Sequence, residues 1–100
     1  MSDLHSKIKA EIESINRYAT RYVTRTIDFE EAIKSKGIRL YLDMVRSVDG
    51  TEEQLVKASR DFVSYVNQFP TRRVNVSAAL RGPGSKMLSR LENILYPEQD

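Results

Sequence analysis

The chain has 100 residues, a length that suits one small domain. It carries 16 Lys and Arg against 14 Asp and Glu, and its hydrophobic class makes up 40% of the residues, which excludes a disordered or collagen-like polypeptide. Cysteine is absent, so disulfides, thiol nucleophiles and thiolate metal sites are excluded. We expect a cytoplasmic protein with no signal peptide and no membrane segment, because even the longest apolar runs, such as 40–42 and 78–80, are short.

The first predicted element is a helix that begins near residue 4. Apolar residues recur there every three or four positions, which places them on one stripe of a helix. The stripe consists of Leu4, Ile8, Ile12, Ile15, Ala19 and Tyr22. The stretch 22–27 is β-branched and aromatic and favours an extended chain, so we expect the helix to end between residues 22 and 27.

A second helix is predicted from Asp28 to Val48. Asp28 and Glu31 have the spacing of a helix start, with a short acceptor at the cap and a carboxylate three residues later. Gly37 lies in the middle of this helix and marks close packing, a bend or a break between two shorter helices. The local pattern leaves these three alternatives open.

The third helix has the clearest start signal. Thr51 and Gln54 have the spacing of a capping box, directly after the turn pair at 49–50. Its apolar stripe continues to Phe69, where Pro70 is expected to end the helix by biasing the preceding residue out of helical geometry.

The remaining chain is predicted to be irregular and then helical. Residues 71–77 alternate like a strand, and we expect an extended linker unless they pair with 22–27. Residues 82–84 predict a turn. Ser85 is the predicted N-cap of a short last helix that Pro97 terminates.

The fold class that these elements predict is an all-α, small antiparallel bundle of three main helices plus a short C-terminal helix. One domain would cover residues 1–96, with a mobile tail at 97–100. An α+β fold with a minimal two-strand pairing of 22–27 and 73–77 is the alternative. No internal repeat is predicted, and the stripe spacing leaves a homo-oligomer open.

Catalytic residue types are scarce. His5 is the single histidine, near the start of the chain, where a surface position is expected. The acidic pairs at 30–31 and 52–53 each fall in the first turn of a predicted helix, where the helix dipole explains them. The stretch 82–86 lacks the Gly-Lys-Ser/Thr of a phosphate-binding loop. We therefore predict a protein that is not an enzyme, with no catalytic residues, no metal site and no cofactor.

The most distinctive feature is a row of three arginines, Arg17, Arg21 and Arg25, with Tyr18 beside them. Their spacing of four places them on one face of the predicted first helix. Arg21 has an arginine four positions away on each side and no acidic residue three or four positions away. The repulsion between these arginines is mildly destabilising unless an acidic group faces Arg21. The row is a solvated face, the partner of another helix, or the contact for an external anion.

A second basic zone lies in the last third of the chain. No acidic residue occurs between Phe62 and Leu91. The basic residues of this zone are Arg72, Arg73, Arg81, Lys86 and Arg90. Helix-turn-helix and ribbon-helix-helix patterns both fail at positions that those scaffolds require to be apolar or helical.

The predicted function is that of a non-catalytic small helical binding protein. It would act as a regulator, inhibitor or adaptor that docks on a larger protein or nucleoprotein complex through the arginine row and the second basic zone. Direct binding of nucleic acid or another anionic ligand through these basic zones is the alternative. Such binding would weaken steeply with salt, because each phosphate contact releases counterions.

Overall fold

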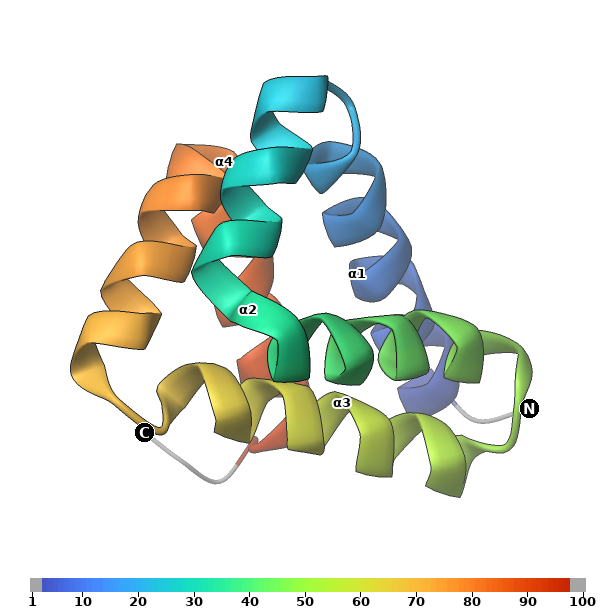
Figure 1. Cartoon of the computed structure of the whole chain (residues 1–100). Helices are drawn as coiled ribbons and strands as arrows, with labels where there is room; N and C mark the ends of the chain where they lie inside the picture. The colour runs from blue at the N-terminus through green and yellow to red at the C-terminus, as the bar shows by residue number, and fades with distance from the viewer. Residues whose placement is uncertain (1–2, 98–100) are drawn as a thin grey trace.

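The computed structural model describes residues 3–97, and this part of the chain consists of helices and short connections without a strand (Figure 1). The elements are α1 (Asp3–Ala19), α2 (Val23–Arg46), the 3-10 turn η1 (Ser47–Asp49), α3 (Glu52–Asn67) and α4 (Pro70–Leu95). The predicted all-α bundle is confirmed. The α+β alternative is wrong, because 23–27 lies in α2 and 73–77 lies in α4. Of the predicted mobile tail, residues 98–100 lie outside the described part.

Each of the two long helices contains one break. Lys34 in α2 has φ 58° and ψ −174°, and Arg81 in α4 has φ 60° and ψ −166°. Such a positive φ is unfavourable for a residue with a side chain and cannot continue a right-handed helix. Each long helix therefore consists of two helical segments that meet at an angle, as the bends in α2 and α4 show in Figure 1.

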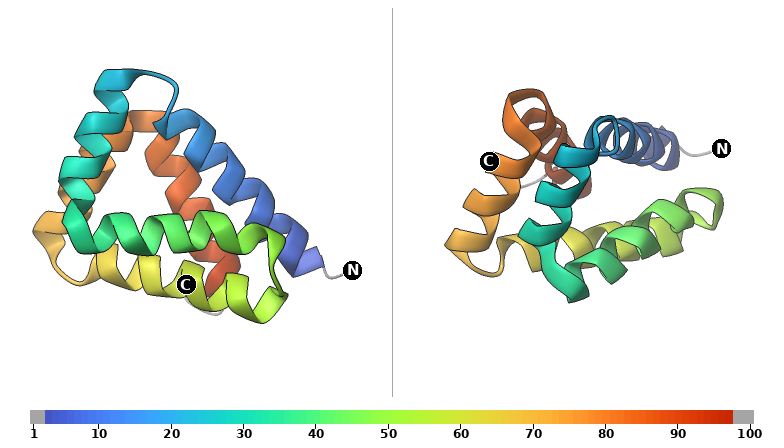
Figure 2. Two further views of the ribbon diagram at one scale, coloured as in Figure 1. Left: turned by 45° about the vertical axis from the view of Figure 1, so that its right-hand side comes forward. Right: turned by 45° about the horizontal axis from the view of Figure 1, so that its top comes forward.

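The segments that follow the two breaks pack against helices from the other half of the chain. The most extensive helix contacts join α1 with α4 and α2 with α3. Figure 2 shows the segment of α4 after its break beside α1, and the segment of α2 after its break beside α3. The last segment of each half of the chain thus packs against the first helix of the other half.

The two halves of the chain share one helical arrangement, which the sequence, where no internal repeat is predicted, did not reveal. The first unit, α1 and α2, corresponds to the second unit, α3 and α4, with each residue of the second lying 47 positions after its equivalent. Tyr22 caps α2 with φ −126° and ψ 143°, and its equivalent Phe69 caps α4 with φ −129° and ψ 139°. The breaks at Lys34 and Arg81 are equivalent in the same way.

Few side chains are identical between the units. Tyr18, Thr24, Arg25, Ala32 and Gly37 recur as Tyr65, Thr71, Arg72, Ala79 and Gly84. At the core positions the two units have different apolar residues, such as Ile8 against Leu55 and Ile15 against Phe62, all of them buried. The repeat is therefore evident in the backbone and hidden in the sequence.

The recurring glycines lie where the two units touch. A Cβ added to Gly37 would lie 2.7 Å from the Tyr65 ring, and one added to Gly84 would lie 3.3 Å from the Tyr18 ring. The same contact thus occurs twice with the roles of the units exchanged, as in a two-fold arrangement. Of the alternatives for Gly37, the structure shows close packing at the glycine itself, whereas the break and its bend lie three residues earlier, at Lys34.

The boundary between the first two helices differs from the prediction. α1 ends at Ala19, and α2 begins at Val23, five residues before the predicted start at Asp28. Arg25 donates from Nη1 to the Tyr18 carbonyl at 2.8 Å, and Thr26 donates from Oγ1 to the Ala19 carbonyl at 3.1 Å. These side chains satisfy carbonyls that the end of α1 leaves open, which favours a break there.

The last third of the chain also differs from the prediction. Pro70 does not precede a linker; it opens α4, where its fixed φ and its missing N–H suit the first helical turn. The predicted short helix from Ser85 is the end of this long helix, which resumes directly after the break at Arg81. The capping box of Thr51 and Gln54 at the start of α3 is confirmed.

Candidate functional site

An open groove forms where the end of α1, the start of α2 and the second segment of α4 meet. Its volume is about 490 Å³. Ser14, Arg17, Tyr18, Arg21, Tyr22, Arg25, Pro83 and Met87 line it, and we call it the basic groove. Its lining includes three arginines and no carboxylate, so its electrostatic potential favours an anionic group.

Arg25 lines the basic groove and packs on two of its tyrosine rings. Its guanidinium lies 3.9 Å from the centre of the Tyr18 ring and 4.9 Å from that of Tyr22, in addition to its hydrogen bond to the Tyr18 carbonyl. Arg72 makes the equivalent contacts in the second unit, 3.9 Å from Tyr65 and with a 2.8 Å bond to its carbonyl. Because Arg25 and Arg72 make the same contacts in the two units, we infer that both have a structural role.

Arg17 and Arg21 are different. Both are exposed, and neither forms an ion pair with any residue in the range 3–97. Arg21 lies 5.6 Å from the Tyr22 ring, a contact that leaves its N–H groups available. These two guanidiniums therefore have unused donors that face an open groove.

The predicted arginine row does not lie on one helix. Arg17 belongs to α1, Arg21 lies in the connection 20–22, and Arg25 is in the first turn of α2. The helical spacing that suggested the row is thus wrong for two of the three residues. The sharp turn after Ala19 nevertheless brings all three to the same groove, beside Tyr18.

The residues of the second basic zone are mostly engaged within the protein. Arg72 bonds to a carbonyl as described, and Arg73 pairs with Glu92 at 2.8 Å. Arg81 pairs with Asp28 at 3.8 Å, and Arg90 lies 3.3 Å from Glu11. The second zone therefore adds little free positive charge to a binding surface.

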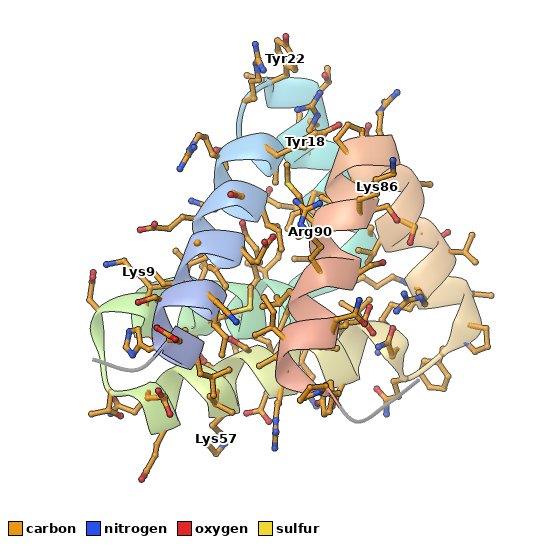
Figure 3. The ribbon with its side chains drawn as sticks, turned by 180° about the vertical axis from the view of Figure 1, so that it is seen from behind. Lys9, Tyr18, Tyr22, Lys57, Lys86 and Arg90 are labelled. Carbon is orange, nitrogen blue, oxygen red and sulfur yellow. The ribbon has the colours of Figure 1, made fainter. Side chains whose placement is uncertain are left out.

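Lys86 is the exception within the second zone. It is exposed and has no ion pair among residues 3–97. Figure 3 shows it on α4 at the same end of the molecule as Tyr18 and Tyr22, whereas Lys57 lies at the opposite end. It could extend the positive potential around the basic groove.

Three exposed apolar side chains near the groove form what we call the apolar rim, and the sequence did not predict their exposure. Tyr22 is 53% exposed and Val23 77% exposed, and Ile27 one turn later is 50% exposed. Tyr22 fits the apolar stripe of the first predicted helix by its spacing, which assigned it to the core. The end of α1 at Ala19 turns it outward, and the only signal for this was the β-branched composition of 22–27.

Pro83 and Met87 enter the groove from α4, and no sequence signal links them to α1. The break at Arg81 directs the second segment of α4 back along α1 and so places these side chains opposite Tyr18. A contact between segments so far apart in the chain depends on a break that local sequence patterns do not reveal.

The single histidine has a structural contact. His5 Nε2 lies 3.1 Å from the Val48 carbonyl, a contact that holds the start of α1 against η1. Among residues 3–97 no group of three or more His, Asp or Glu side chains is placed to hold a metal ion. In the same range no helix has the length and apolar character of a membrane span.

A small cavity lies beneath the start of α2. It has a volume of about 120 Å³, and Phe29, Ile33 and Tyr41 contribute to its mainly apolar wall. Typical ligand pockets have volumes of about 300–1,000 Å³, so this cavity is too small for most cofactors. The Tyr41 hydroxyl donates to Asn16 Oδ1 at 2.6 Å, and burial raises the pKa of this hydroxyl far above its usual value.

Comparisons with protein-family models, with curated proteins and with solved structures find no match to this chain. The functional argument therefore rests on the geometry of the basic groove.

Proposed function

We propose that the protein is a non-catalytic binding module, a regulator, inhibitor or adaptor, that docks on an acidic segment of a larger protein through the basic groove. The observation that carries this proposal is the pair of unpaired guanidiniums, Arg17 and Arg21, in a groove without carboxylates. Guanidinium groups bind carboxylates in a bidentate manner, so an acidic side chain would satisfy donors that the protein itself leaves open.

The surroundings of these arginines favour a protein over a nucleic acid. Exposed Tyr22 and Val23 adjoin the groove, and Met87 lies in its wall. Arginine, tyrosine and methionine are enriched in the centres of protein interfaces. A nucleic acid would contact a longer track of cations, and most of the second basic zone is engaged in internal pairs.

A binding titration with an oligoglutamate peptide as the probe tests this proposal. We expect the double variant R17Q/R21Q to bind about tenfold or more weakly than the native chain, because charge-assisted hydrogen bonds to two guanidiniums are lost. The variant K7Q/R46Q is a matched control, since it removes the same charge at exposed positions outside the groove. Far-UV circular dichroism confirms that both variants keep their helices.

Three results would contradict the proposal. The first is an equal loss in R17Q/R21Q and K7Q/R46Q, which would show that only net charge matters. The second is the absence of binding to the peptide at low salt. The third is tighter binding to a single-stranded oligonucleotide than to the peptide, with a steep salt dependence, which would favour the nucleic-acid alternative.

A further inference from the structure

The repeated unit supplies a second groove that is equivalent to the basic groove. It lies between α3 and the second segment of α2 and has a volume of about 400 Å³. Lys36, Leu40, Asp61, Ser64, Tyr65 and Gln68 line it, and each lies 47 positions from a residue of the basic groove. We call it the second groove.

The framework of the two grooves is the same. Tyr65 takes the place of Tyr18, and its ring is covered by Arg72 at 3.9 Å as Tyr18 is by Arg25 at 3.9 Å. Tyr18 of the basic groove and Tyr65 of the second groove each pack against a glycine of the other unit. The shape of the groove therefore follows from contacts that both units preserve.

The side chains above this framework differ in charge. Arg17 corresponds to Ser64, Arg21 to Gln68, and Ser14 to Asp61. The second groove is thus lined by one lysine and one aspartate, which balance each other, and Asp61 also pairs with Lys57 at 3.0 Å. The positive potential of the basic groove comes from residues that the architecture of the unit does not need.

We propose that Arg17 and Arg21, together with the absence of an acid at Ser14, are the specificity determinants for the acidic partner, and that the second groove is the same binding framework without them. This inference rests on the proposed function, because it assumes that the basic groove binds an acidic segment. It means that arginines at 64 and 68 with serine at 61 are sufficient to make the second groove an equivalent site.

The test is a transplant between the two grooves of the full chain. The variant D61S/S64R/Q68R carries the basic-groove residues in the second groove, and all three positions are exposed, so the helices should be retained. Isothermal titration with oligoglutamate should give one site for the native chain and two sites of similar affinity for this variant. The variant R17S/R21Q, which converts the basic groove toward the second, should lose the site.

A rescue variant separates this inference from the proposed function. R17S/R21Q/D61S/S64R/Q68R should regain one site, and amide chemical shifts should move in α3 rather than in α1. The control S6R/A10R/E31S has the same charge change as the transplant at exposed positions outside both grooves and should keep one site. The simpler variant S64R/Q68R provides a second test should the triple replacement unfold.

The outcomes are distinguishable. If the native chain does not bind the peptide, or if R17S/R21Q binds as tightly as the native chain, the proposed function fails. If the native chain binds and R17S/R21Q does not, while both the transplant and the rescue variants gain no site, the proposed function stands and this inference is overturned. A second site in the control S6R/A10R/E31S would also overturn it, because charge alone would then be sufficient.

Discussion

Replacement of Gly37 by alanine tests the contact that joins the two units. An added Cβ would lie 2.7 Å from the Cβ of Ile33 and 2.7 Å from Cε2 of Tyr65, closer than real Cβ atoms approach other atoms. Neither neighbour is the free end of a flexible side chain. The Cβ of Ile33 is fixed by the backbone just before the break, and the Tyr65 ring is covered by Arg72. The substitution therefore requires the two units to move apart at Tyr65 and the backbone of α2 to shift at Ile33.

The expected magnitude is the difference between two effects. Overpacking a well-packed site costs about 1–3 kcal/mol, and two contacts of this kind at Gly37 place the cost at about 3 kcal/mol. Alanine gains about 1 kcal/mol over glycine in a helix interior. We expect a net loss of about 2 kcal/mol in the free energy of unfolding, which corresponds to a fall in Tm of about 10 °C for a domain of this size.

Urea unfolding followed by far-UV circular dichroism measures this loss, and two other glycines serve as references. A Cβ added to Gly82 meets nothing within 4 Å, so Gly82→Ala should be neutral or stabilising by up to about 1 kcal/mol. Gly84→Ala should lie between the two, because its added Cβ is 2.7 Å from Leu80 but 3.3 Å from the Tyr18 ring. A Gly37→Ala variant as stable as Gly82→Ala would refute the reasoning.

Two further variants test buried or stacked polar groups. Tyr41→Phe loses the hydrogen bond to Asn16 and should cost about 1 kcal/mol at neutral pH. Burial raises the pKa of the folded Tyr41 hydroxyl above the unfolded value of 10.0, so stability should fall as pH rises above that value, and urea unfolding at alkaline pH should show a smaller fall in Tyr41→Phe. Arg72→Lys should lower the free energy of unfolding by about 1 kcal/mol, and with it the urea midpoint, because an ammonium cannot both stack on Tyr65 and reach its carbonyl as a planar guanidinium does. Arg17→Lys should leave the midpoint unchanged, and equal effects of the two arginine variants would contradict the distinction between them.

Signals that lie within one helix predicted this fold well. The apolar stripe through Ile8, Ile12 and Ile15 is buried as its spacing indicates. The capping box of Thr51 and Gln54 forms as predicted, since both partners lie within one turn. Such features depend on residues three or four positions apart, and the sequence displays those directly.

Features that depend on distant residues were missed. The end of α1 at Ala19 is favoured by side chains of α2 that bond to its last carbonyls, and the stripe through Tyr22 gives no sign of it. The helical conformation of 71–77 likewise opposes the β propensity of its valines. Buried Val76 shows that tertiary packing outweighs that weak local preference.

The internal repeat escaped detection because a core position constrains volume and polarity more than identity. Ile15 and Phe62 occupy equivalent buried positions and share little beyond being apolar. Two of the residues that recur unchanged have a geometric reason: Arg25 and its equivalent must reach a carbonyl and a ring at once, and Gly37 has no room for a side chain. Identity between the units is thus confined to a few positions scattered over each.

The repeat also changes how the arginine row is interpreted. In the sequence, Arg17, Arg21 and Arg25 form one set with a common spacing, and nothing separates a structural arginine from one that is free to bind. The second unit makes the separation, because it keeps the equivalent of Arg25 with the same contacts and replaces those of Arg17 and Arg21 by uncharged residues. Since the second unit folds without these two arginines, the first unit does not need them for folding. Their unpaired charge, set against an exposed aromatic and apolar rim, is the reason why we propose a partner outside the chain.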